Sequence, residues 1–252
     1  MPFFNVEKTL DLSISSILDQ SYEDFDLYLV DDGSNDNSYE IAAKRTKEDH
    51  RIILTQNIKN IGLSRSLNNI IFDLKTDYIA RMDADDEAHK NRFKNQINFL
   101  EKNKKISILG TNVDYFENNV FLGSSNLPID NNSIKNKLSR SNVIIHPSVM
   151  MRTNFLKDIG GYRNFFTNGQ DYELWLRARK NYNFINLEDK LLRYKIVPKK
   201  NFKNDLYGIF ARIINLSFDK YFFVQFFWIF ISLTLIFLRR IGFKQSIFRK
   251  KK

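Results

Sequence analysis

Short apolar segments alternate with helical segments along the first hundred residues, and this alternation limits the folds open to the chain. Residues 26–30 (DLYLV) and 51–57 (RIILTQN) have the apolar content of strands. Apolar residues recur at helical spacing over residues 7–20, and helix-like segments at 39–49 and 64–74 follow the strands. Strands alternating with helices predict an α/β fold whose parallel sheet has right-handed crossovers.

The second half of the chain is less regular. A hairpin is expected over residues 106–125, with its turn near Asn118, and a short helix around residues 132–140. A strand over residues 143–152 and a last helix over residues 169–180 complete the prediction.

Carboxylates gather at the ends of two predicted strands. Asp31 and Asp32 follow the first strand, and DADDE (83–87) follows the apolar segment YIARM. Ligands of open α/β sheets bind outside the carboxyl ends of strands, so both clusters are expected to face one crevice. Two carboxylates separated by one residue, such as Asp83 and Asp85, suit Mg²⁺ or Mn²⁺, whose other ligands are water and phosphate oxygens. An isolated Asp-x-Asp is more often a solvated turn, but the second cluster favours a metal site.

Two other common features are absent from the sequence. It contains neither G-x-G-x-x-G nor G-x-x-x-x-G-K, so a bound diphosphate would be neutralised mainly by metal, which makes it a competent leaving group. It has no cysteine, which excludes disulfides and thiolate metal sites, and its first residues show no signal-peptide pattern. Both observations suit a catalytic domain in the cytoplasm.

The last fifth of the chain differs from the rest in charge. Residues 1–200 hold 29 Lys and Arg against 27 Asp and Glu, whereas residues 201–252 hold 10 against 2. The uncharged, aromatic run 222–238 favours a membrane surface over nucleic acid as the partner. Because its 17 residues would make a helix about 25 Å long, short for a full crossing, we expect residues 220–252 to be peripheral or anchored at the inner face of the cell membrane. Burial in a partner or dimer interface is the alternative.

Five motifs together resemble those of a known enzyme family. In order along the chain they are PFFNVEKTLDLSISSILDQSYEDFDLYLVDDGSNDNS, NIGLSRSLN, YIARMDADD, HPSVMMR and GQDYELWLR. They resemble the inverting family-two glycosyltransferases, over residues 2 to about 195. The resemblance implies a GT-A fold, a Rossmann-like mixed sheet flanked by helices. It also implies a catalytic domain over 1–200, with a nucleotide-sugar half (1–103) and an acceptor half (104–200), and a membrane-associating tail over 201–252.

The resemblance also implies residue roles. The metal would be held by Asp83 and Asp85, with Asp86 as a neighbour. The general base would be Asp171, although Gln170 replaces its usual acidic partner, and Glu173 would have a supporting or solvated role. The residues implied to bind the nucleotide-sugar are Asp31, Asp32, Ser34, Asn60, Arg65, Asn68, Asp83 and His146.

The implied chemistry is a direct displacement at the anomeric carbon. Asp171 would deprotonate an acceptor hydroxyl, while Mn²⁺ or Mg²⁺ would stabilise the departing nucleoside diphosphate. The donor would be a nucleotide-diphosphate sugar, with UDP-sugar expected, and the acceptor a surface glycan or a lipid-linked glycan. This places the chain among hexosyl- or N-acetylhexosaminyl-transferases.

One departure from the family pattern concerns the N-terminus. Family members begin with an apolar strand, whereas this sequence begins at the turn that follows it, MPFFN. We therefore expect the first strand to be missing and an apolar gap in its place, with the native start upstream of Met1 or the protein decayed. The alternative to an active glycosyltransferase is thus a non-catalytic relative that binds nucleotide-sugar or partners at the membrane. A nucleotidyltransferase is disfavoured because its basic, glycine-rich opening loop is absent.

Overall fold

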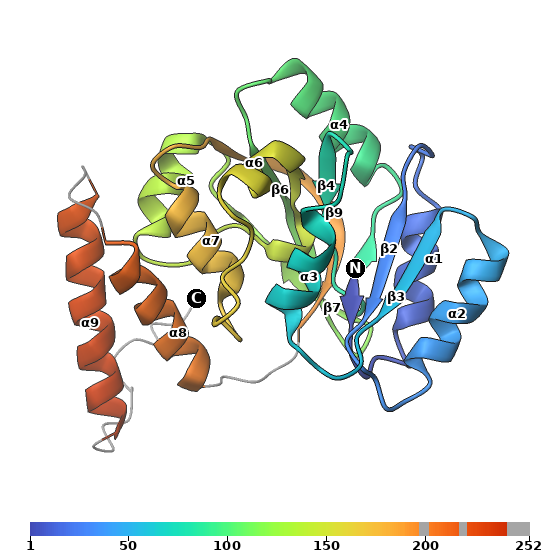
Figure 1. Ribbon diagram of the computed structural model, residues 1–252. Helices are drawn as coiled ribbons and strands as arrows, with labels where there is room; N and C mark the ends of the chain where they lie inside the picture. The colour runs from blue at the N-terminus through green and yellow to red at the C-terminus, as the bar shows by residue number, and fades with distance from the viewer. Residues whose placement is uncertain (197–201, 217–220, 241–252) are drawn as a thin grey trace.

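The computed structural model describes residues 1–196, 202–216 and 221–240, which form an α/β fold (Figure 1). The strands are β1 (Pro2–Phe3), β2 (Leu27–Asp31), β3 (Ile52–Gln56), β4 (Tyr78–Ala80), β5 (Glu87–Ala88), β6 (Ile108–Glu117), β7 (Val120–Ser124), β8 (Met150–Arg152) and β9 (Phe184–Lys195). The helices are α1 (Leu10–Leu18), α2 (Ser38–Glu48), α3 (Leu63–Ile71), α4 (Arg92–Lys102), α5 (Asn131–Leu138), α6 (Thr153–Asp158), α7 (Gln170–Ala178), α8 (Phe202–Ile214) and α9 (Phe222–Arg240). The expected division at residue 200 and the basic residues 241–252 lie outside the described part.

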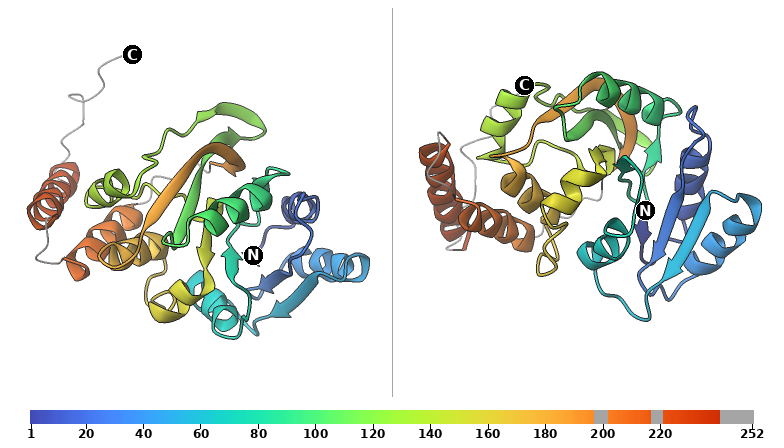
Figure 2. Two further views of the ribbon diagram at one scale, coloured as in Figure 1. Left: turned by 90° about the horizontal axis from the view of Figure 1, so that it is seen from above. Right: turned by 45° about the horizontal axis from the view of Figure 1, so that its top comes forward.

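The N-terminal third forms a parallel sheet in the order β1-β2-β3, as the alternation of strands and helices predicts. Leu10, Ile14 and Ile17 of α1 are buried, in agreement with their helical spacing. In Figures 1 and 2 this sheet, with α1 and α2, lies on the side of the molecule opposite α8 and α9.

The parallel sheet does not continue to β4, contrary to the expectation from the alternation alone. β4 pairs antiparallel with β8, in a mixed sheet of order β4-β8-β6-β9-β5 to which β7 adds through β6. β6 and β9 run parallel in this sheet. The mixed sheet flanked by helices is the arrangement that the family resemblance implies.

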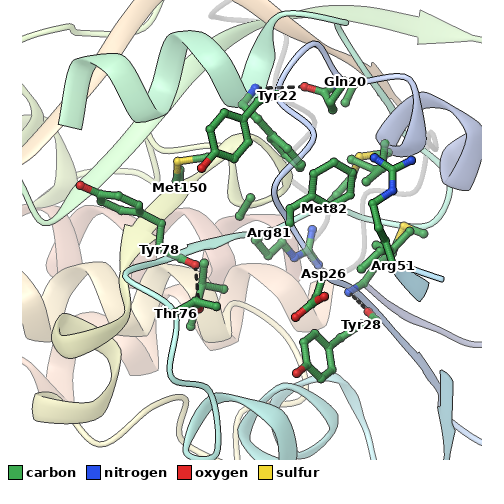
Figure 3. Close-up of a pocket in the computed structure, with 18 of the residues that line it drawn as sticks. Gln20, Tyr22, Asp26, Tyr28, Arg51, Thr76, Tyr78, Arg81, Met82 and Met150 are labelled. Carbon is green, nitrogen blue, oxygen red and sulfur yellow. Dashed lines mark hydrogen bonds between the residues drawn. The ribbon is translucent and has the colours of Figure 1, made fainter. Parts of the chain in front are cut away.

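A short first strand is present where the sequence led us to expect none. Pro2 and Phe3 pair in parallel with Val30 and Asp31 of β2. Beside them, residues of β2 and β4 line a cavity of about 1700 Å³ (Figure 3). A gap is therefore present beside β1, but it is not purely apolar: Leu27, Val30 and Met150 line it together with the charged residues Asp26, Arg51 and Arg81.

The hairpin and the late apolar helix lie close to where they were predicted. Asn118 and Asn119 link β6 to β7 with φ of 48° and 66°, values that asparagine tolerates better than most residues. The run 222–238 lies within α9. Among residues 1–196, 202–216 and 221–240, no helix has both the length and the apolar character needed to cross a membrane.

Candidate active site

Three aspartates lie together in the loop after β4. One potential ligand atom from each of Asp83, Asp85 and Asp86 lies within 4.8 Å of those of the other two. α1 holds this loop in place: the Thr9 hydroxyl donates to the Ala84 carbonyl oxygen at 3.0 Å, and the Ser13 hydroxyl donates to that of Asp86 at 2.7 Å. The pair predicted to bind metal is thus joined by a third carboxylate.

Burial makes this cluster costly to ionise without a counter-charge. Burial, and then the charge of Asp83, raise the pKa of Asp86 to about 8. The same two causes raise the pKa of Asp85. Asp86 Oδ1 accepts a hydrogen bond from the Lys195 backbone N–H at 2.8 Å, whereas its buried Oδ2 has no partner among the described residues. An orphaned carboxylate oxygen beside two further carboxylates fits a divalent cation.

A buried arginine, which the sequence reading did not single out, compensates part of this charge. Arg81 is only 4% exposed and forms an ion pair with Asp83. Its Nε and Nη1 have no hydrogen-bond partner in the described part of the chain. Its position in an otherwise apolar strand segment, YIARM, was the available signal, because a buried cation needs a partner.

The predicted general base lies at the start of α7. Asp171 is half-buried, and its Oδ2 accepts a hydrogen bond from Asn142 Nδ2 at 2.7 Å. Burial raises the pKa of Asp171, and the charge of Arg81 opposes that shift. The neighbouring Gln170 has a buried Oε1 with no partner among the described residues. A carboxylate with a raised pKa is a suitable proton acceptor near neutral pH.

The charges of Asp171 and of two cluster aspartates affect the pKa of the same residue, Tyr194. Burial raises the pKa of Tyr194, and the charges of Asp86, Asp83 and Asp171 raise it further. The placement of Asp171 beside the predicted metal ligands stays a prediction.

The carboxylates of Asp31 and Asp32 accept hydrogen bonds from neighbouring residues of the chain. The fully buried Asp31 accepts hydrogen bonds from the Ser34 backbone N–H at 3.0 Å and from Gln56 Nε2 at 2.8 Å. The Asp32 carboxylate accepts hydrogen bonds from the Gly62 N–H and three further donors at the entrance to α3: Asn57 Nδ2, the Ile61 N–H and the Ser66 hydroxyl. Both aspartates shape the loops around the predicted nucleotide site, and direct contact with a nucleotide stays a prediction.

The other predicted donor-binding residues are spread over the adjoining loops. Asn60 and Arg65 are exposed. Asn68 ties α3 to another loop, because its Nδ2 donates to the Tyr162 carbonyl oxygen at 2.7 Å and its Oδ1 accepts from the Tyr162 N–H at 2.9 Å. A Cβ on Gly33, whose φ is 76°, would come within 2.8 Å of the Lys59 carbonyl carbon, so glycine allows these two loops to approach.

Two further side chains lie in the core. His146 is buried, its Nε2 is 2.8 Å from the Tyr162 hydroxyl, and burial lowers its pKa. The role of His146 in nucleotide-sugar binding therefore stays a prediction. Glu173 is fully buried and ion-paired with Arg177 at 2.9 Å and Arg163 at 3.2 Å, so the solvated role is wrong, and the supporting role stays a prediction.

Comparison with known sequences agrees with this arrangement. A sequence model of the family "Glycosyl transferase family 2" matches residues 1–160. The putative glycosyltransferase EpsE of Bacillus subtilis strain 168 is 34% identical over 201 residues, covering 78% of this chain and 70% of that protein. The O-antigen biosynthesis glycosyltransferase WbnJ of Escherichia coli is 33% identical over 214 residues, covering 82% of both.

A further Escherichia coli relative carries a more detailed name. The UDP-Glc:alpha-D-GlcNAc-diphosphoundecaprenol beta-1,3-glucosyltransferase WfgD is 31% identical over 183 residues, covering 73% of this chain and 69% of that protein.

Solved structures share the fold at low sequence identity. S. aureus TarS 1-349 in complex with UDP-GlcNAc gives a TM-score of 0.71 at 17% identity, covering 98% of this chain and 72% of that one. The mannosyltransferase PcManGT from Pyrobaculum calidifontis, in complex with GDP-Man and Mn²⁺, gives 0.70 at 12% identity, covering 97% and 74%. With the family match over residues 1–160, the chain belongs to glycosyltransferase family 2 and has the GT-A fold.

Proposed function

We propose that the chain moves a hexosyl or N-acetylhexosaminyl group from a nucleotide-diphosphate sugar, a UDP-sugar, to a glycan hydroxyl. The observation that carries the proposal is the cluster of Asp83, Asp85 and Asp86, whose ligand atoms lie within 4.8 Å of one another. TarS in complex with UDP-GlcNAc supports the choice of donor through its shared fold.

The acidic cluster would hold Mn²⁺ or Mg²⁺. Asp83 and Asp85 are the predicted ligands, and we add Asp86, because its Oδ2 is buried and has no hydrogen-bond partner among the described residues. A bound divalent cation supplies charge neutralisation at the diphosphate. The ion pair of Arg81 with Asp83 orients that ligand. The Mn²⁺ complex of PcManGT supports this assignment.

Asp171 would accept the proton of the acceptor hydroxyl. The hydroxyl oxygen forms a bond to the anomeric carbon as the bond from that carbon to the diphosphate oxygen breaks, and the nucleoside diphosphate leaves. Attack opposite the leaving group inverts the anomeric centre. The hydrogen bond from Asn142 fixes the orientation of the Asp171 carboxylate.

The acceptor would be a surface glycan or a lipid-linked glycan at the inner face of the cytoplasmic membrane. WbnJ is named for O-antigen biosynthesis, and the name of WfgD specifies a diphosphoundecaprenol substrate. The first name supports a surface glycan as the acceptor, and the second supports a lipid-linked one.

Calorimetric titration with UDP, with and without Mn²⁺, tests this function. We expect Mn²⁺ to strengthen UDP binding, and Asp85→Ala to weaken the Mn²⁺-dependent binding at least about tenfold. Asp73→Ala, an exposed aspartate outside the cluster, is the matched control and should bind as the wild type does. Unchanged binding in Asp85→Ala would contradict the metal assignment, and no UDP binding by folded wild-type protein would favour the non-catalytic reading.

A further inference from the structure

The outward side of α9 differs from that of an ordinary surface helix. Such a helix turns its apolar side inward and its polar side to solvent. The inward side of α9 contains a polar residue that is fully buried: Gln225 donates to the Arg212 carbonyl oxygen at 2.7 Å and accepts from Arg179 Nη2 at 2.7 Å, and Ile229, one turn further on, is 8% exposed. On the same side, the Ser232 hydroxyl accepts from Arg212 Nη2 at 2.9 Å, and the guanidinium carbon of Arg140 lies 4.3 Å from the Trp228 ring centroid.

The opposite side of α9 is apolar and exposed. Phe223 is 82% exposed and Phe230 is 65% exposed, and Phe226, Phe227 and Leu233 are also exposed. At about 100° per residue these side chains form one stripe, on the far side of the helix from Gln225. We call this stripe the aromatic face of α9. Contiguous exposed apolar surface of this kind marks a site of interaction.

The neighbouring helix and loop add apolar surface. On α8, which packs against α9, Leu206, Phe210 and Ile213 are exposed and share one helix face. Phe165 is 58% exposed, and its ring lies 6.2 Å from that of Phe210. In both Figures 1 and 2, α9 forms the outer boundary of the molecule on this side. An extended surface can therefore approach it.

The charge of the adjoining sequence indicates what covers this face. Residues 239–252, RRIGFKQSIFRKKK, contain seven Lys and Arg and no Asp or Glu. Aromatic side chains next to a dense run of cations suit the interface of an anionic bilayer, where the rings enter the headgroup boundary and the cations meet lipid phosphates. A second copy of the chain would bring two basic segments together, which their repulsion disfavours.

We propose that the aromatic face of α9 docks on the surface of an anionic phospholipid bilayer, while the polar side of α9 stays fixed to the enzyme through Arg140, Arg179 and Arg212. The docking proposal extends the proposed function, and it rests on that function only for the lipid-linked acceptor. Docking itself needs neither donor nor catalysis, so it can be tested separately.

Vesicle co-sedimentation of the full chain tests the proposal. We compare vesicles of phosphatidylcholine alone with vesicles that also contain phosphatidylglycerol. The wild type is expected to partition at least about tenfold more strongly onto the anionic vesicles, and added salt is expected to weaken this binding. The triple variant Phe223→Ser/Phe227→Ser/Phe230→Ser is expected to lose about tenfold or more of it.

A matched control comes from another exposed apolar segment. Val120, Phe121 and Leu122 of β7 are 61%, 56% and 51% exposed, so Val120→Ser/Phe121→Ser/Leu122→Ser removes similar apolar surface and is expected to bind vesicles as the wild type does. Far-UV circular dichroism of both triple variants shows whether they are folded, and calorimetric UDP titration of the wild type tests the proposed function separately. If wild type binds vesicles but not UDP, the proposed function fails and the docking stands.

Three outcomes would overturn the docking proposal. The first is equal vesicle binding by wild type and the α9 variant. The second is equal binding to neutral and anionic vesicles. The third is a wild-type dimer that the α9 variant makes monomeric, with no vesicle binding by either, which would assign the aromatic face to a second copy of the chain.

Discussion

Asp171 has a carboxylate that its surroundings make more basic than an exposed aspartate. Replacement of Asp171 by Asn keeps the shape of the side chain and removes the proton acceptor. We expect kcat to fall by about 10²–10⁴-fold, the KM for the donor to change little, and UDP affinity to be unchanged. Initial-rate kinetics with a saturating acceptor, together with UDP titration, measure these quantities. A parallel loss of UDP affinity would instead make Asp171 a donor-binding residue.

The protonation of Asp86 is coupled to folding. Its pKa is raised to about 8 in the folded chain, against 3.8 as the ordinary value, so between these pH values the folded state holds a proton that the unfolded state has lost. In metal-free buffer its contribution to stability is therefore present at low pH and declines as pH rises toward 8, by at most about 1.4 kcal/mol per pH unit.

The Asp86→Asn variant lacks this titration. We expect its free energy of unfolding, measured by denaturant titration in the presence of a chelator, to fall less between pH 5 and 8 than that of the wild type. Identical pH slopes for variant and wild type would show that Asp86 does not take up a proton on folding.

The site residues that could be predicted from the sequence were those whose spacing along the chain points to a metal site. Asp83 and Asp85 are separated by one residue at a strand end, and the structure brings their carboxylates together. Asp86 was expected only as a neighbour, because the sequence does not show which way a side chain points from an irregular loop. Arg81 was missed because its partner, Asp83, was already assigned to a metal.

Among the elements, the turn after β2 depends on Gly33. Gly33 and Gly160 have nearly equal φ of 76° and 78°, but only a Cβ on Gly33 would meet neighbouring backbone, at 2.8 Å. Gly160→Ala should therefore cost only the backbone strain, about 1–2 kcal/mol. Gly33→Ala should cost more and should also weaken UDP binding, because the loop at Asn60 must move. Denaturant titration and calorimetry of the pair measure both effects, and equal behaviour would contradict this role of Gly33.

Elements with local periodicity could be predicted, and those defined by distant pairing could not. α1 and β2 follow from apolar spacing and lie close to the expected ranges. β9 was missed because the charged residues 188–190 interrupt its pattern, and its main partner, β6, lies nearly eighty residues earlier in the chain. The antiparallel pairing of β4 with β8 is likewise a long-range contact that the alternation of strands and helices does not encode.

At the scale of the whole molecule, the C-terminal helices are continuous with the catalytic part. Ala211 of α8 belongs to the same buried cluster as Trp175 of α7, and Tyr207 packs against that cluster. Gln225 of α9 accepts its hydrogen bond from Arg179, just beyond α7. The helices that carry the proposed bilayer contact therefore also complete the core behind the helix of Asp171.

This continuity limits how the enzyme can be shortened. Removing α8 and α9 to obtain a better-behaved protein would discard the exposed phenylalanines, but it would also open the core at Ala211 and take Gln225 away from Arg179. The first 200 residues alone would lose the exposed aromatic side chains of α9 but would expose core residues that α8 and α9 cover. A soluble form is better obtained by substituting the aromatic face of α9 than by truncating the chain.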